Sequence, residues 1–218
     1  MTVSCIVVGL NEWERYTKPM LESTLKSNPD MPLVCVDNGS EPEYPDFELA
    51  QMVRLNKKYS YAGGLNTGLF LAPKSDWYIV INNDTLITKP IVKRFETLDH
   101  NCLYGFKLYE APGNHFPFDY LSGWCMFLSK TLIEVVGTFD EELAPMYFED
   151  ADLSYRASQQ GFGLVELDRS DWGIAHLENI RHSERRQYMD KHIDERKQNR
   201  RYVMEKHGLA DRTDTSSR

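Results

Sequence analysis

The stretch Val3–Gly9 (VSCIVVG) is a short, nearly continuous run of apolar and mostly β-branched residues. Such a run is typical of a strand that is buried on both faces, as in a parallel sheet. A helical segment follows over residues 13–27, and a second apolar strand over residues 32–37 leads into the turn Asn38-Gly39-Ser40. Strand, helix and strand within about 35 residues make one βαβ unit. The opening stretch therefore predicts an α/β fold.

The alternation of strand and helix continues through the first half of the chain and becomes less regular beyond it. Further strands are expected at residues 51–55, 77–82, 102–109, 120–128 and 162–167. Further helices are expected at residues 63–72, 89–98, 130–136, 149–161 and 183–206. This order predicts a doubly wound, mostly parallel sheet flanked by helices, with a C-terminal helical tail.

The net charge of −8 is unevenly distributed over the 218 residues. Residues 181–206 hold nine Lys/Arg and five Asp/Glu, so residues 1–180 carry a net charge of −12. An acidic body argues against binding nucleic acid over the whole surface, and it suits a site that captures a divalent cation.

Composition and length indicate one soluble domain. No apolar run approaches the roughly 18 residues of a membrane span, and no basic segment precedes the first apolar run, so we expect neither a transmembrane segment nor a signal peptide. The four cysteines are scattered without a CxxC pair, which is typical of buried thiols in a reducing cytosol. We therefore expect a cytoplasmic protein.

Two aspartates end predicted strands. Ligands of doubly wound sheets bind beyond the carboxyl ends of the strands, so we expect Asp37 and Asp84 to face the same crevice. Asp84 follows two asparagines and suits Mg²⁺ or Mn²⁺, which prefer oxygen ligands. Asp37 suits a hydrogen bond to a ribose or nucleobase. The alternative is that both aspartates only form polar turns.

The glycine-rich stretch of residues 63–68 is a weaker signal. It matches neither G-x-G-x-x-G nor a Walker motif. Its glycines permit close backbone approach, and a helix that starts there offers free N–H groups to an anion.

The most informative stretch is Phe148-Glu149-Asp150-Ala151-Asp152. Three carboxylates within four residues repel one another. Such a cluster is typical of a site in which carboxylates bind a metal, act as a base or bind a cationic substrate. The alternative is an acidic first turn that complements a helix dipole. His176 lies among apolar residues, where it is either a structural histidine or a nitrogen ligand for a metal.

Taken together, these motifs resemble the family 2 inverting glycosyltransferases of the GT-A fold, particularly the rhamnosyltransferase-like branch. The resemblance covers about residues 3–180. It rests on Asn11-Glu12, Val36-Asp37-Asn38-Gly39-Ser40, Asn56, the glycine-rich stretch with Asn66, Ile81-Asn82-Asn83-Asp84-Thr85, Leu121-Ser122-Gly123 and Tyr147-Phe148-Glu149-Asp150-x-Asp152-Leu153-x-x-Arg156.

The resemblance implies a role for each motif. The donor would be a nucleotide-diphosphate sugar, bound by Asp37, Asn11, Asn66, Gly64 and Asn83. Asn82-Asn83-Asp84 occupies the D-x-D position, where Asp84 would bind Mn²⁺ or Mg²⁺ together with His176, although Asn82 replaces the first aspartate. Asp150 would be the general base, with Glu149 beside it in the catalytic pair.

The same resemblance divides the chain. Residues 1–100 would form the nucleotide-sugar-binding half of a domain over residues 1–180, and residues 101–180 the acceptor half. Acceptor specificity is expected over residues 104–120. The acceptor would be a glycan, a lipid-linked glycan or a modified nucleic acid.

The basic tail of residues 181–218 admits several interpretations. It is a solvated helix with i,i+4 ion pairs, or it covers the donor so that Arg181, Arg185 or Arg186 contacts the diphosphate. Two further alternatives are a peripheral contact to a membrane and a contact to a nucleic acid acceptor. Two other functions stay open at this point: a nucleotidyltransferase that acts on sugar phosphates, and a non-catalytic nucleotide-sugar-binding module.

Overall fold

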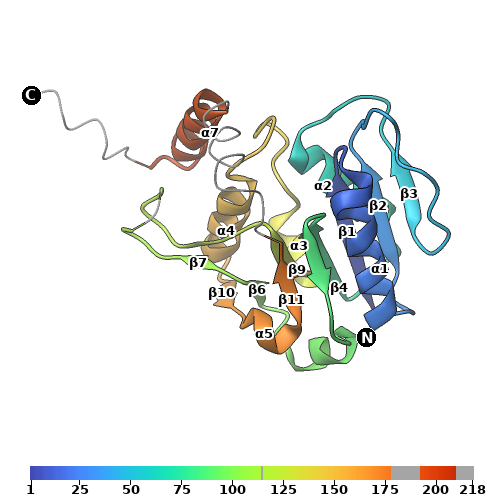
Figure 1. Cartoon of the computed structure of the whole chain (residues 1–218). Helices are drawn as coiled ribbons and strands as arrows, with labels where there is room; N and C mark the ends of the chain where they lie inside the picture. The colour runs from blue at the N-terminus through green and yellow to red at the C-terminus, as the bar shows by residue number, and fades with distance from the viewer. Residues whose placement is uncertain (114, 178–191, 210–218) are drawn as a thin grey trace, which may run out of the picture.

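The computed structural model describes residues 1–113, 115–177 and 192–209. Its strands are β1 (Val3–Gly9), β2 (Leu33–Asp37), β3 (Gln51–Arg54), β4 (Trp77–Asn82), β5 (Thr85–Ile87), β6 (Cys102–Gly105), β7 (Leu108–Tyr109), β8 (Tyr120–Leu121), β9 (Cys125–Ser129), β10 (Gly163–Glu166) and β11 (Ile174–His176). The main sheet of this part of the chain has seven strands in the order β10-β6-β9-β4-β1-β2-β3 (Figure 1). Among these seven, β9 alone is antiparallel to its neighbours, which confirms the expected mostly parallel sheet.

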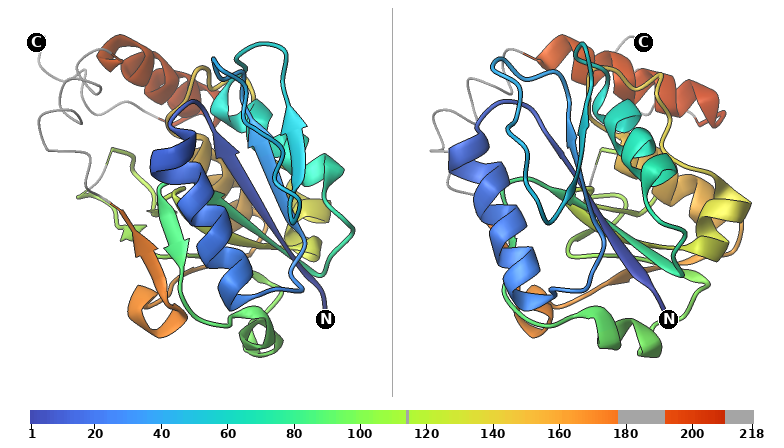
Figure 2. Two further views of the ribbon diagram at one scale, coloured as in Figure 1. Left: turned by 45° about the vertical axis from the view of Figure 1, so that its right-hand side comes forward. Right: turned by 90° about the vertical axis from the view of Figure 1, so that its right-hand side faces the viewer.

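Helices cover both faces of the sheet. They are a π-helical turn η1 (Trp13–Thr17), α1 (Lys18–Ser27), α2 (Tyr61–Leu71), a 3-10 helix η2 (Val92–Thr97), α3 (Lys130–Val136), α4 (Glu149–Gln159), α5 (Arg169–Trp172) and α7 (Ile193–Lys206). Side chains of α1, η2 and α5 pack on one face, and those of α2, α3 and α4 pack on the other (Figure 2). The sheet is therefore the middle layer of three.

Alternation along β1 explains its continuous apolar sequence. Cys5 and Val7 point to the layer that holds Met20 of α1, whereas Ile6 and Val8 point to the layer that holds Leu65 of α2. Successive side chains of a strand point to opposite faces. Because both faces are covered, every position of β1 is buried.

Several element boundaries differ from the sequence prediction. The helix expected over residues 89–98 is only a 3-10 turn, because Arg94 and Leu98 donate backbone hydrogen bonds to carbonyls three residues earlier. The strand expected over residues 102–109 divides into β6 and β7, and β7 leaves the main sheet to pair with β8. Most of the helix expected over residues 183–206 lies in α7, and its first part lies outside the described residues.

Helix α2 begins earlier than predicted, so its glycines lie inside it. Ser60 caps the helix by accepting a hydrogen bond from the backbone N–H of Gly63. A Cβ atom at Gly64 would lie 2.8 Å from Val8 Cγ1, and one at Gly68 would lie 2.3 Å from Ile6 Cγ2. The glycines therefore let α2 approach β1 closely, instead of forming a phosphate-binding loop.

None of the helices in the described ranges combines the length and apolarity that a bilayer span requires. The four cysteines are free thiols, and Cys5, Cys35 and Cys125 are buried as expected.

Replacement of Gly68 by alanine tests the close packing of α2 on β1. Alanine favours a helix interior by up to about 1 kcal/mol, but overpacking a core costs about 1–3 kcal/mol. We expect Gly68→Ala to lower the urea midpoint of unfolding. Gly113→Ala is the matched control, because a Cβ there meets nothing closer than 3.6 Å. A Gly68→Ala protein as stable as the native chain would contradict the packing argument.

Candidate active site

A cleft of about 1070 Å³ opens beyond the carboxyl ends of β1 and β4. Strand β1 pairs with β2 on one side and with β4 on the other, so the chain order of the strands reverses there. Loops that leave such a reversal separate and leave a crevice, which is the usual ligand site of a doubly wound sheet. The segment before α4 and the first residues of that helix form the opposite side of the cleft.

Asp84 and His176 meet at one end of the cleft. β5 and β11 pair antiparallel with Thr85 opposite His176, which brings the histidine beside the aspartate that precedes Thr85. The Asp84 Oδ1 and His176 Nε2 atoms are 3.2 Å apart. The imidazole ring stacks on Trp124, with ring centroids 4.6 Å apart and planes tilted by 5°. This stack fixes the orientation of the imidazole.

The Asp84–His176 pair fits a divalent cation. The buried Oδ1 atom of Asp84 faces His176 Nε2 and accepts no other hydrogen bond from the described residues. The oxygen is therefore met either by a proton on Nε2 or by a cation that both atoms bind. A carboxylate oxygen and an imidazole nitrogen are both ligands of Mn²⁺. Within the described residues no group of three or more His, Cys, Asp or Glu side chains converges for a metal. Oxygen atoms of a bound ligand and water would complete such a coordination shell.

The two asparagines before Asp84 are held by hydrogen bonds at the same end of the cleft. Tyr61 donates its hydroxyl to Asn82 Oδ1 over 2.6 Å, and Asn83 donates its side-chain amide to Thr17 Oγ1 over 2.9 Å. Burial, and then the neighbouring carboxylates, raise the pKa of Tyr61 well above its usual value. Tyr61 therefore remains a neutral donor, and the side-chain oxygen of Asn82 accepts its hydrogen bond instead of facing a ligand.

Asp150 lies at the other end of the cleft, where its carboxylate is held by two backbone N–H groups. Gly123 donates to Oδ2 over 2.7 Å and Ala151 donates to Oδ1 over 2.8 Å. A Cβ atom at position 123 would lie 2.9 Å from the Cβ of Asp150, so this approach requires glycine. Burial outweighs these hydrogen bonds and raises the pKa of Asp150 to about 6.

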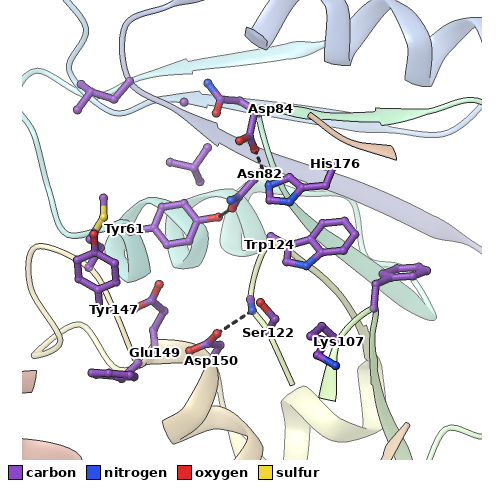
Figure 3. Close-up of a pocket in the computed structure, with 18 of the residues that line it drawn as sticks. Tyr61, Asn82, Asp84, Lys107, Ser122, Trp124, Tyr147, Glu149, Asp150 and His176 are labelled. Atoms are coloured by element: carbon purple, nitrogen blue, oxygen red, sulfur yellow. Dashed lines mark hydrogen bonds and ion pairs between the residues drawn. The ribbon is translucent and has the colours of Figure 1, made fainter. Parts of the chain in front are cut away.

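Glu149 is the more deeply buried member of the pair. Its Oε2 atom accepts no hydrogen bond from the described residues, although the side chain lines the cleft. Burial, and then the neighbouring charge of Asp150, raise the pKa of Glu149 to about 8. Figure 3 shows both carboxylates on the side of the cleft opposite Asp84 and His176.

Asp152, the third carboxylate of the cluster, does not line the cleft. It is fully buried and faces Arg156, Lys206 and His207 at 2.8, 2.6 and 2.9 Å. Glu149 and Asp150 thus line the cleft, whereas Asp152 belongs to a buried ion-pair network.

The structure brings together only part of the predicted donor site. Asn11 and Asn83 line the cleft with Asp84. Asp37 does not face the crevice, contrary to our expectation, because its buried carboxylate accepts hydrogen bonds from the backbone N–H groups of Ser40 and Tyr44.

Two further predicted donor residues lie away from the cleft. Gly64 packs on Val8. Asn66 donates its side-chain amide to Phe139 O and to Glu141 Oε1, and so holds the segment that follows α3. Arg181, Arg185 and Arg186, which we considered for the donor diphosphate, lie outside the described residues.

Several residues that line the cleft lie outside the motifs that predicted the site. They are Tyr61, Trp124, His115 and Arg196. Tyr61 lies just before the glycine-rich stretch and Trp124 just after Leu121-Ser122-Gly123, so their place in the sequence indicates that they are near the site. His115 and Arg196 come from an irregular loop and from the tail, and only tertiary packing brings them to the cleft.

No protein-family model and no curated protein sequence matches this chain. Solved structures do resemble it. The mannosyltransferase PcManGT from Pyrobaculum calidifontis, in complex with GDP-Man and Mn²⁺, is 14% identical with a TM-score of 0.58 over 76% of this chain and 54% of that one. GalNAc-T7 with UDP, GalNAc and Mn²⁺ is 14% identical with a TM-score of 0.60 over 76% of this chain and 41% of that one.

A third similar structure is S. aureus TarS, at 18% identity and a TM-score of 0.55 over 77% of this chain and 35% of that one. The chain thus spans about half or less of the length of these three proteins. At such low identity the likeness establishes the fold, which is the expected GT-A fold.

The raised pKa of Glu149 predicts a pH-dependent stability. The folded protein retains a proton that the unfolded chain releases near the ordinary pKa of 4.5, so the stabilising contribution is present below that pH and is lost as the pH rises through about 8. We expect the free energy of unfolding of the native chain to fall between about pH 5 and pH 9 on the order of a few kcal/mol more than that of Glu149→Gln. Urea unfolding at a series of pH values measures this difference.

The exposed Glu96→Gln is the matched control, and it should follow the native chain at every pH. Identical pH dependence of the native and Glu149→Gln proteins would show that Glu149 is not held protonated by burial.

Proposed function

We propose that this protein is an inverting glycosyltransferase that moves a sugar from a nucleotide-diphosphate sugar to an acceptor hydroxyl. The observation that carries the proposal is the placement of Asp150 across one cleft from the Asp84–His176 pair (Figure 3). A single displacement with inversion needs a base on the side of the sugar opposite the leaving group. The cleft has the carboxylate of Asp150 on one side and, on the other, the Asp84–His176 pair, which would hold a cation at the leaving group.

The donor side is the end of the cleft at Asp84. The similar structures of PcManGT and GalNAc-T7 contain GDP-Man or UDP together with Mn²⁺. Asp84 and His176 would hold Mn²⁺ or Mg²⁺, which would neutralise the charge that develops on the diphosphate. Asn11 and Asn83 line the same end and offer polar contacts to the nucleotide. Asp37 would act on the donor only through the loop that it holds.

Asp150 is the proposed general base of the transfer. The acceptor oxygen forms a bond to the anomeric carbon as the bond from that carbon to the diphosphate oxygen breaks. The acceptor proton passes to the carboxylate of Asp150, and the bonding electron pair leaves with the nucleoside diphosphate. The two backbone donors fix the direction of the Asp150 carboxylate, and a pKa near 6 leaves it ionised and basic at neutral pH.

The acceptor side is the end of the cleft around Asp150. Aromatic side chains surround it, among them Tyr109, Tyr120 and Tyr147, and such rings suit the apolar faces of sugars. We assign residues 1–100 to the donor half and residues 101–180 to the acceptor half of the catalytic unit, with His176 of the latter reaching back to Asp84. The acceptor would be a glycan, free or lipid-linked, or a modified nucleic acid, and we place the reaction in the cytoplasm.

Replacement of Asp150 tests the base. We expect Asp150→Asn to lower sugar transfer by about 10²–10⁴-fold, because the isosteric amide cannot accept the proton. The native enzyme should lose kcat/KM as the pH falls through about 6, since protonation removes the base at a higher pH than for an ordinary aspartate. Exposed Asp30→Asn is the control for the charge change. Full activity in Asp150→Asn would remove Asp150 from the mechanism.

Nucleotide binding tests the donor side without any acceptor. A ligand of the folded state at a hundredfold excess over its Kd stabilises by about 2.7 kcal/mol. We expect GDP or UDP with Mn²⁺ to raise the melting temperature by several degrees, at about 2–4 °C per kcal/mol for a chain of this size. Asp84→Asn should lose the part of the shift that depends on Mn²⁺, whereas Asp30→Asn should keep it. No shift with any nucleoside diphosphate would contradict a donor site.

A further inference from the structure

Helix α7 lies near helix α4 (Figure 1), and one side of α7 contacts the start of α4 and the segment before it. Arg196, Asn199, Val203 and Lys206 follow at intervals of three or four residues, which places their side chains on one side of a helix. Val203 and Met204 are buried in a cluster with Phe148 and Ala151. Over residues 193–206 this buried face corrects the interpretation of the tail as a solvated helix.

The C-terminal end of this face binds the buried Asp152. Lys206 lies 2.6 Å from Oδ1, and His207 Nε2 lies 2.9 Å from the same atom. Lys206 also reaches Asp140 over 2.7 Å. Because breaking a buried ion pair leaves a charge without compensation, these contacts fix the position of α7 along α4.

The middle of the face holds the segment that leads into the catalytic pair. Asn199 is 4% exposed and donates its side-chain amide to Met146 O over 2.9 Å. Tyr147 and Phe148, the next two residues, have φ of 87° and 73°, a left-handed backbone that non-glycine residues rarely adopt. The contact therefore ties α7 to the backbone that enters Glu149 and Asp150.

One helical turn earlier, the same face carries Arg196 into the cleft. Its guanidinium lies 5.9 Å from the ring centre of Tyr147 and 5.5 Å from that of Phe148. Its positive charge lowers the pKa of Asp150, although burial of Asp150 has the larger and opposite effect. Arg196 therefore belongs to the acceptor end, away from the Asp84–His176 pair.

The charge of Arg196 has no carboxylate partner within the described ranges. Its guanidinium donates to Nε2 of His115 over 2.7 Å. Arginine has no acceptor, so His115 must take the neutral form with its proton on Nδ1. Burial, and then the charges of Arg196 and Arg200, lower the pKa of His115, which keeps it neutral. The contact orients the guanidinium without neutralising it.

We propose that Arg196 recognises an oxyanion, a phosphate or a carboxylate, that the acceptor carries near its reactive hydroxyl. A guanidinium presents paired N–H donors that match the oxygens of such groups, and here neighbouring side chains already hold it in place. That the acceptor occupies this end of the cleft rests on the proposed function, in which Asp150 is the base for the acceptor hydroxyl. The binding of an oxyanion at Arg196 does not depend on that function.

Binding of simple anions to the full-length chain tests the proposal without donor or metal. Glycerol 3-phosphate and D-glycerate would each be titrated calorimetrically in buffer with EDTA, which leaves the Asp84–His176 pair without a cation. We expect saturable binding of at least one anion, in about the millimolar range. Hydrogen bonds to charged groups predict that Arg196→Gln weakens this binding about tenfold or more.

Two variants act as controls. Arg201→Gln removes an exposed arginine of the same helix and should bind as the native chain does. Arg196→Lys keeps the charge without the paired donors and should fall between the native chain and Arg196→Gln. Unfolding midpoints that match the native value show that each variant is folded.

The two anions separate the two chemistries. Binding of glycerol 3-phosphate alone identifies a phosphate-bearing acceptor, and binding of D-glycerate identifies a carboxylate. No binding of either anion to the native chain would overturn the proposal. So would a loss of less than tenfold in Arg196→Gln, whatever the outcome for Asp150→Asn in sugar transfer.

Discussion

A carboxylate that is removed from water needs compensation by positive charge and hydrogen bonds, and Asp152 meets this requirement at the centre of the C-terminal half. Its partners are Arg156 of its own helix, Lys206 at the end of α7, and His207, which follows α7. Arg156 in turn donates to the carbonyl of Val136, the last residue of α3, and to that of Thr138 just after it. One buried charge thereby sets the relative positions of three helices, including the one that carries the proposed base.

Three carboxylates of one short stretch meet three different environments because of helix geometry. Successive residues of an α-helix are rotated by about 100°, so Glu149, Asp150 and Asp152 point in different directions from α4. The first is buried at the cleft with an oxygen that accepts no hydrogen bond from the described residues, the second is held by Gly123 and Ala151, and the third faces α7. A density of acidic residues in a sequence thus indicates a site without saying how many of its members belong to it.

Much of the fold could be predicted from the sequence, because apolar runs and turns are local signals. The strands Val3–Gly9 and Trp77–Asn82 were predicted with their bounds, and so was the helix over residues 130–136. Asp84, His176 and Asp150 were predicted as site residues, and the structure places all three in one cleft, although their chemical roles remain predictions. For Asp37 the expected position was wrong, since hydrogen bonds to Ser40 and Tyr44 turn its carboxylate away from the crevice.

The buried face of α7 was not apparent from the sequence. Its polar members, Arg196, Asn199 and Lys206, look like solvated residues until their partners in distant segments are known. The glycines of α2 were misleading in the other direction, because they suggested a ligand site where there is packing. They suggested a phosphate loop, whereas glycine is required at positions 64 and 68 because Val8 and Ile6 of β1 leave no room for a Cβ atom.

The separation of Asp152 from its partners has a consequence for synthesis on the ribosome. Lys206 follows Asp152 by 54 residues. At about 5–20 residues per second, roughly three to ten seconds pass between the synthesis of Asp152 and that of Lys206 and His207. During that interval Arg156 is the nearby cation of Asp152, and Glu149 and Asp150 precede it in the same acidic stretch. Packing of α7 on α4 cannot precede the synthesis of residues 193–207, so the end of the cleft that Arg196 lines cannot be complete before then.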